Sequence, residues 1–241
     1  MAAIRRWVAI AMASGLVAVA LRWGTAAVGA DIRAAPGGTP LTAVAVGTRA
    51  LALTFELPAP APALPSVLGA LTQMGVSATF FVSDAVIHQD PAAIAQLIDD
   101  GEEVELLAPA SLAQGAPRSI ALLRGAAAAL SGSAGKPRFV RLRPGGLDPQ
   151  ALHGAREAGL VPVVWSLDPA DWAQPGAGVI AGRVLGGASP GGIVRLMVTA
   201  ETAQALPAIV DGLRGQGWQF LTLDGLLALA EVQPPPGVTD G

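Results

Sequence analysis

The sequence predicts an α/β fold built on a parallel sheet. Apolar runs of strand length alternate with helical hydrophobic patterns along most of the chain. The first such run, Ala50 to Leu57, alternates apolar and small residues and stops at Pro58, as a buried strand does. Its carboxyl end carries Glu56, at the position where α/β proteins usually place their chemistry. About seven strands of this kind predict a sheet that is closed or nearly closed into a barrel.

The composition limits the possible functions. The chain has 241 residues, 52% of them hydrophobic, which is enough for one substantial core and a single domain. The net charge of -3 argues against a nucleic-acid partner. Cysteine is absent, which excludes disulfides and thiolate metal ligands. The two histidines, His88 and His153, are expected at the surface, His88 in a connection and His153 on an amphipathic helix.

Residues 1–30 have the pattern of a signal peptide or membrane anchor. Arg5 and Arg6 precede an uncharged apolar run from Trp7 to Leu21. This run is shorter than the roughly 20 residues of a spanning helix, and Arg22 interrupts it, so we favour a cleaved signal over an anchor. In both cases the expected location is extracytoplasmic, either secreted or held at the membrane by this segment alone.

The remaining boundaries follow from composition. Residues 31–40 are rich in alanine, glycine and proline and are expected to form a linker. The domain is expected to cover residues 41–230, and residues 231–241 are expected to form a flexible tail. At the start of the domain, Leu41 to Val46 and the Ala50 strand are separated by three turn-forming residues, which predicts a hairpin.

The other elements are predicted from periodicity and from turn residues. Gly75, Gly101 and Gly159 are placed to end helices, and Asp90 with Pro91 is placed to begin one. Further strands are predicted at 77–82, 103–107, 138–141, 161–165, 193–198 and 219–222. Helices are predicted at 64–74, 91–100, 119–130, 149–158, 179–185 and 206–213, and after Asp224.

Several segments resemble the polysaccharide deacetylases, a carbohydrate esterase family with the NodB-homology domain. Leu53-Thr54-Phe55-Glu56-Leu57 resembles the family's first motif, Leu-Thr-Phe-Asp-Asp. Residues 75–82, 165–172 and 217–223 are similar to later family segments in the same order, the last especially to the spore-former subgroup. The resemblance extends from about Leu41 to Leu227. It implies an irregular barrel of about seven strands, and the subgroup alone suggests a role in sporulation.

The resemblance also implies that the metal site is degenerate. The family's catalytic base and first metal ligand fall on Glu56 and Leu57. Its two zinc-binding histidines fall on Leu107 and Ser111, and its general-acid histidine falls on Met197. We therefore expect no metal cofactor, and we expect the leucines and the methionine to make a shallow pocket with an apolar floor.

Two functions remain open at this stage. Metal-assisted hydrolysis of an N-acetyl group needs a Lewis acid, a base and an acid, and a transition metal needs about three protein ligands. We favour a pseudoenzyme that binds a cell-wall glycan, peptidoglycan or chitin-like, or an envelope protein. The alternative is an active or residual carbohydrate N-deacetylase, a hydrolase of amide C–N bonds that uses Glu56, Arg141 and Asp171. A purely structural role is a third possibility.

Five residues are the candidate binding residues: Glu56, Arg141, Asp168, Asp171 and Trp172. Each also has a structural interpretation. Glu56, Arg141 and Asp171 are expected to form an ion-paired cluster, and the two aspartates can cap the turn around Pro169. For Trp172 we favour buried packing over stacking on a sugar.

Two arginines and three glutamates outside this group are also notable for their positions near predicted strands. Arg143 and Arg195 are unusual beside strand ends and are candidates for contacts with an anionic glycan or a partner. Glu102, Glu103 and Glu105 are expected to form a solvated edge.

Overall fold

The computed structural model describes residues 39–108, 116–142 and 149–232. The predicted signal or anchor segment, most of the predicted linker, and residues 233–241 lie outside this range, as do Ser111 and Arg143. Among the helices of the described ranges, none is long and apolar enough to cross a membrane.

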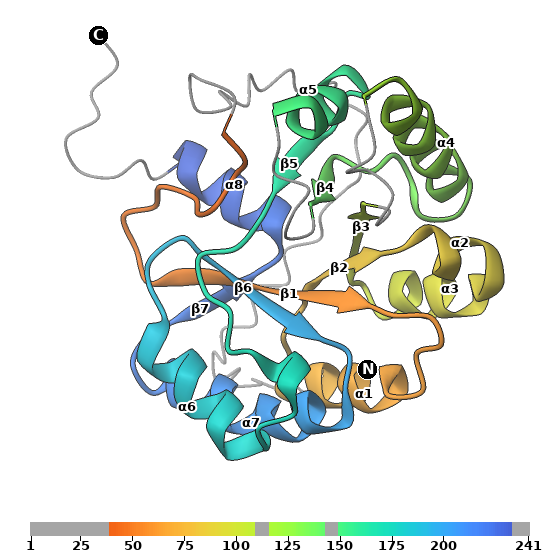
Figure 1. Cartoon of the computed structure of the whole chain (residues 1–241). Helices are drawn as coiled ribbons and strands as arrows, with labels where there is room; N and C mark the ends of the chain where they lie inside the picture. Colours follow the sequence, from red (N-terminus) through yellow and green to blue (C-terminus); the bar gives the residue numbers. More distant parts are fainter. Residues whose placement is uncertain (1–38, 109–115, 143–148, 233–241) are drawn as a thin grey trace, which may run out of the picture. The chain divides into compact units, whose positions relative to one another are not determined.

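A curled, parallel seven-stranded sheet forms the centre of the domain (Figure 1). The strands are β1 (Ala50–Leu57), β2 (Thr79–Val82), β3 (Glu103–Leu107), β4 (Phe139–Arg141), β5 (Val161–Val163), β6 (Gly192–Met197) and β7 (Gln219–Leu221). Their order is β5-β4-β3-β2-β1-β6, and β7 pairs with the first residues of β1. A bridge between Leu167 and Val194 connects the two ends of the half-barrel. The predicted parallel α/β fold is confirmed.

Helices follow the strands and cover the outside of the sheet (Figure 1). They are α1 (Leu64–Met74), α2 (Asp84–Gln89), α3 (Pro91–Asp99), α4 (Ala116–Ala134), α5 (Pro149–Glu157), α6 (Ala177–Gly187), α7 (Ala200–Arg214) and α8 (Leu223–Val232). A 3₁₀ turn, η2 (Asp171–Ala173), lies between β5 and α6. Gly75 ends α1 in the left-handed conformation, as predicted.

The alternation of side chains along the strands separates the large core beneath the helices from the inner face of the sheet. Leu51, Leu53, Phe55 and Leu57 of β1 face outward and join the large core beneath the helices. The inner face carries a smaller apolar cluster. Its buried members are Phe81, Leu107, Phe139, Val163, Ile193 and Leu223. Polar side chains lie on the inner face above and below this cluster, at the carboxyl and amino ends of the strands.

Two local predictions are wrong. Leu41 to Val46 does not form a hairpin with β1, because Leu41 bridges Val163 and Ala43 bridges Gly192. This crossing needs a close approach: a Cβ on Gly191 would collide with the carbonyl oxygen of Val44. His88 lies in helix α2 rather than in a connection. A six-residue helix is too short to show a helical period, and the Ser83 side chain caps it.

The acidic residues of β3 are not a solvated edge. Glu105 is 4% exposed, and its Oε2 accepts hydrogen bonds from the backbone N–H groups of Arg138 (2.9 Å) and Phe139 (2.8 Å). Oε2 of Glu103 accepts from Thr79 Oγ1 (2.6 Å) and from the backbone N–H of Leu223 (2.8 Å). Both glutamates share the inner face with Leu107, because the side-chain period of a strand is two.

Burial changes the ionisation of these carboxyl groups. Burial raises the pKa of Glu105 to about 9, and nearby Glu103 adds to this rise. Burial also raises the pKa of Glu103 and that of Glu102 to about 7. The amino end of the barrel therefore holds carboxyl groups that keep their protons well above the usual range.

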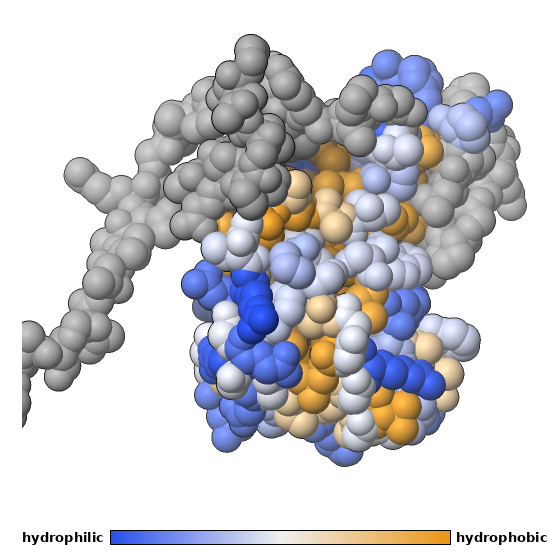
Figure 2. All heavy atoms as spheres, turned by 90° about the vertical axis from the view of Figure 1, so that its left-hand side faces the viewer, coloured by the Kyte–Doolittle hydropathy of each residue, from blue (hydrophilic) through white to orange (hydrophobic). Residues whose placement is uncertain are grey.

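On the side drawn in Figure 2, hydrophobic residues form several groups between hydrophilic ones. The large hydrophobic side chains that are exposed within the described ranges are Ile98, Trp172 and Val179.

Candidate functional site

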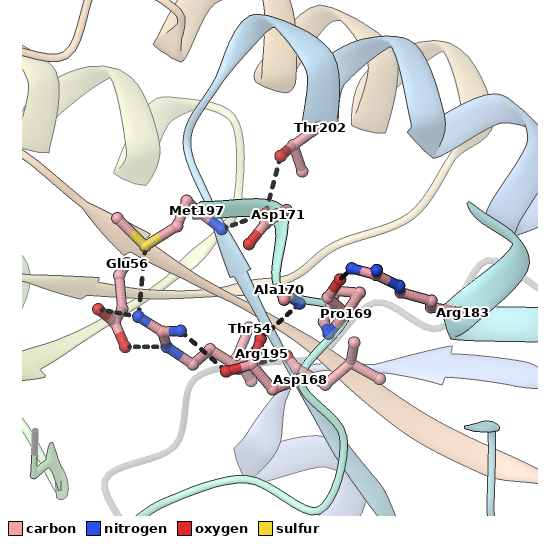
Figure 3. A network of polar contacts seen from close by, with 11 residues as sticks. Thr54, Glu56, Asp168, Pro169, Ala170, Asp171, Arg183, Arg195, Met197 and Thr202 are labelled. Atoms are coloured by element: carbon pink, nitrogen blue, oxygen red, sulfur yellow. Dashed lines mark hydrogen bonds and ion pairs between the residues drawn. The ribbon is translucent and has the colours of Figure 1, made fainter. Parts of the chain in front are cut away.

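The candidate site lies on the inner face at the carboxyl ends of β1 and β6. In the register of these two strands, Thr54 is the partner of Arg195 and Glu56 is the partner of Met197. Because alternate residues of a strand point to the same side, these four side chains share the inner face. The segment after β5 supplies Asp168 and Asp171 from the side (Figure 3).

The centre of the site is an ion pair between Glu56 and Arg195 (Figure 3). Arg195 donates from Nε to Glu56 Oε1 (2.7 Å) and from Nη2 to Glu56 Oε2 (3.2 Å). Nη1 of the same guanidinium donates to Asp168 Oδ2 (3.0 Å). Burial alone would lower the pKa of Arg195, but its hydrogen bonds to Glu56 and the charge of Asp168 raise it. Arg195 is therefore a permanent cation between two carboxylates.

Arg141 is buried beneath this pair and bonds to neither carboxylate. It is fully buried, and Nη2 donates to Thr54 Oγ1 (2.7 Å), which in turn donates to the carbonyl oxygen of Val194 (2.6 Å). Nε and Nη1 have no hydrogen-bond partner among the described residues. The guanidinium carbon lies 4.1 Å from the ring centre of Phe81. Burial lowers the pKa of Arg141 to about 9.

Asp171 is hydrogen-bonded to strand β6 and to helix α7. Its Oδ2 accepts hydrogen bonds from the backbone N–H of Met197 (2.7 Å) and from Thr202 Oγ1 of α7 (2.8 Å). Its carboxyl group is fully buried, and burial raises its pKa. The predicted ion-paired cluster of Glu56, Arg141 and Asp171 is therefore wrong: Arg195 takes the carboxylate of Glu56, and Asp171 bonds to β6 and α7.

The turn that carries these aspartates holds an exposed tryptophan. Asp168 Oδ1 accepts from the backbone N–H of Ala170 (2.7 Å), so the prediction that Asp168 caps this turn is confirmed. Ala170 and Gln174, on either side of η2, both have positive φ, at 55° and 50°. Trp172 between them is 60% exposed, so the expectation of buried packing is wrong. A left-handed backbone at non-glycine residues gives no sequence signal, and it turns this side chain outward.

Trp165 lies between the two arginines. Its ring centre is 4.8 Å from the guanidinium carbon of Arg195 and 5.8 Å from that of Arg141. Both distances are within the range of cation–π contacts. Trp165 is half-buried, so this aromatic face is at the boundary between the buried arginine and the surface.

The described residues do not fit a zinc site. Leu57 points outward into the core beneath the helices, whereas Leu107 belongs to the inner apolar cluster. Met197 lies on the inner face with its Sδ 3.6 Å from Arg195 Nη2. Within the described ranges, no three histidine, aspartate or glutamate side chains are placed to hold a metal ion. Leu57 therefore does not contribute to the expected apolar pocket floor, whereas Leu107 and Met197 lie on the inner face. The shallow pocket itself stays a prediction.

Sequence reasoning identified most of the individual residues but not their pairing. Arg195 was recognised as unusual, but its bond to Glu56 follows only from the β1–β6 register. Thr54 and Thr202 were missed, although each contacts a charged side chain of the site. The alternating pattern of both strands is the signal that could have placed Thr54 and Arg195 on one face.

The relatives found by comparison with known proteins are carbohydrate deacetylases. No family model matches the chain. The chain is 35% identical over 201 residues to a chitooligosaccharide deacetylase of a Bradyrhizobium species, covering 75% of this chain and 91% of that protein. It is 29% identical over 181 residues to a peptidoglycan N-acetylglucosamine deacetylase of Listeria monocytogenes, covering 73% of this chain but only 38% of that longer protein.

Solved structures share the fold. A peptidoglycan N-acetylglucosamine deacetylase superposes with a TM-score of 0.74 at 25% identity, over 79% of this chain and 93% of that one. A CE4 family pseudoenzyme from Bacillus anthracis superposes with a TM-score of 0.72 at 21% identity, over 80% of this chain and 70% of that one. Because the chain is 35% identical to a chitooligosaccharide deacetylase and covers 91% of that protein, it belongs to the NodB-like polysaccharide deacetylases of the CE4 family.

Proposed function

We propose that this chain is an exported pseudoenzyme of the polysaccharide deacetylase family that acts by binding a cell-wall glycan or an envelope protein. Export is inferred from the pattern of residues 1–30, with two arginines before an apolar run. Glycan is favoured as the ligand because the relatives are named for chitooligosaccharide and peptidoglycan.

The observation that carries the loss of catalysis is the bidentate pair between Arg195 and Glu56. A general base must be free to accept a proton from the nucleophile. Both oxygens of the Glu56 carboxylate are bonded to a guanidinium, and the side chain is 5% exposed. Both carboxylate oxygens are therefore directed at Arg195 rather than at a nucleophile. By the family resemblance, Leu107 and Met197 stand where a zinc-binding histidine and the general-acid histidine are expected, and neither side chain can take either role.

The decisive experiment combines metal analysis with an activity assay. The purified full chain is analysed for bound zinc and other divalent metals. Acetate release from chitin oligomers and peptidoglycan is then measured with zinc or cobalt added. We expect no stoichiometric metal and no acetate, together with retention of the protein on at least one insoluble glycan. Metal-dependent acetate release would overturn the proposal of a pseudoenzyme.

A second candidate is a residual carbohydrate N-deacetylase. It is favoured by the relatives named above, which are deacetylases. In this case Glu56, Arg141 and Asp171 would have to carry the reaction. The substitution Glu56→Gln separates the two candidates, because it preserves the shape of the side chain but removes its basicity. Acetate release that is lost in Glu56→Gln would establish the second candidate, and no release from either protein would eliminate it.

A further inference from the structure

The guanidinium group of Arg141 has unused hydrogen-bonding capacity in a buried position. It has five N–H bonds, and its hydrogen bond to Thr54 Oγ1 uses one of them. Nε and Nη1 have no partner within the described ranges, and no carboxylate of those ranges lies within ion-pairing distance of this group. A buried cation without a bonded anion is strongly unfavourable. An arrangement of this kind is typical of a functional site rather than of a structural core.

Two carboxylates of the site form ion pairs with Arg195, and neither forms one with Arg141. Glu56 and Asp168 both bond to Arg195, so the more exposed guanidinium takes both anions and the deeper one takes none. Glu56 nevertheless has the strongest favourable charge interaction with Arg141. Glu56 is therefore close enough to stabilise either cation, although it is bonded to only one of them.

We propose that Arg195 binds one carboxylate group of an acidic sugar and that Arg141 accommodates Glu56, the anion that this carboxylate displaces. The incoming carboxylate replaces Glu56 on Arg195, and Glu56 turns to the unpaired N–H groups of Arg141. No covalent bond is made or broken. Both guanidinium groups are bonded to an anion in the occupied state, whereas only Arg195 is bonded to one in the free state. This inference rests on the proposed glycan-binding function and specifies the class of glycan.

The surroundings favour a sugar acid over a phosphate. The two arginines already have two carboxylates nearby, so a monoanion adds less charge repulsion than a dianion would. Trp165 is half-buried beside both guanidinium groups and offers an aromatic face for a pyranose ring. The turn that bears the exposed Trp172 is connected to Arg195 through Asp168. A ring with one carboxylate matches this combination of cation and aromatic surface.

The test uses a matched pair of ligands and the full chain. Calorimetric titration compares an oligosaccharide of alternating N-acetylglucosamine and glucuronic acid with the same oligosaccharide after reduction of its carboxyl groups. We expect the acidic form to bind at least about tenfold more tightly. Equal affinity for both forms would overturn this inference but would leave glycan binding intact. Binding of neither form would also overturn it, and the metal and acetate measurements would still test the pseudoenzyme separately.

Two variants and a control make the assignment specific. Arg195→Gln should abolish the preference for the acidic form, whereas Arg49→Gln, the same charge change at an exposed residue bonded to the carbonyl oxygen of Gln216, should preserve it. Glu56→Gln should strengthen binding of the acidic form by about tenfold, because the competitor for Arg195 is removed. Unchanged or weaker binding in Glu56→Gln would refute the exchange. This result is informative even where Arg195→Gln fails to fold.

Discussion

Glu105 should make the folded protein less stable as the pH rises from neutral to alkaline. In the folded state the pKa of this carboxyl group is raised from 4.5 to about 9, first by burial and then by the charge of Glu103. Between these two values the folded state holds one proton that the unfolded state has released. The contribution to stability is therefore complete below about pH 4.5 and is lost as the pH approaches 9.

The size of the effect follows from the same pKa. A group that is protonated only in the folded state changes the free energy of unfolding by about 1.4 kcal/mol per pH unit. The pKa of Glu103 is raised only to about 7, so above that pH Glu105 dominates this group of glutamates. From pH 7 to pH 9 we expect Glu105 to account for a loss of about 2 to 3 kcal/mol.

The substitution Glu105→Gln isolates this contribution. The amide oxygen can still accept from the N–H groups of Arg138 and Phe139, but the side chain cannot ionise. Urea unfolding, followed by far-ultraviolet circular dichroism near pH 7 and near pH 9, gives the free energy at each pH. The control is Glu157→Gln at the exposed end of α5, which should not change the slope. A wild-type slope retained in Glu105→Gln would refute the reasoning.

Three further substitutions test the packing and the surface. Phe80→Ala removes a ring that stacks on Phe55 at 5.0 Å in the core, and urea unfolding should show a loss of about 3 to 5 kcal/mol; a loss below about 1 kcal/mol would contradict this packing. Gly191→Ala places a Cβ against Val44 O at φ 71° and should cost at least about 3 kcal/mol, in contrast to Gly69→Ala, which meets no neighbour. Trp172→Ala should change stability by less than about 0.5 kcal/mol but weaken retention on glycan, and unchanged retention would exclude Trp172 from the binding surface.

The fold could be predicted from the sequence because its strands and helices have clear and different periods. The strand β1 is apolar on its helix-facing side, and it pairs with β2, β6 and β7. Helix ends at Gly75 and Gly101 were found because glycine adopts a left-handed conformation easily. Helix α2 and the turn at η2 were missed, since one is six residues long and the other depends on a left-handed backbone at Ala170 and Gln174.

The site was harder to predict because it depends on the register between strands. A period of two places Glu105 on one face of β3, but the sequence does not say whether that face is covered. The structure covers it with Phe139 and Leu223 of the inner cluster, so an acidic residue that suggested solvent is buried. The pairing of Glu56 with Arg195 has the same origin, because the two residues are 139 positions apart in the chain.

The position of Arg195 also constrains what this end of the barrel can do. A guanidinium between Glu56 and Asp168 supplies the positive charge that these carboxylates need, with directional bonds to each. Unlike a metal ion, it has no vacant coordination position and cannot lower the pKa of a bound water. It can exchange one carboxylate for another without loss of charge balance. Under the proposed function, the Arg195–Glu56 pair therefore provides a way to recognise an acidic glycan. The strengthened binding expected of Glu56→Gln separates this role from a purely structural ion pair.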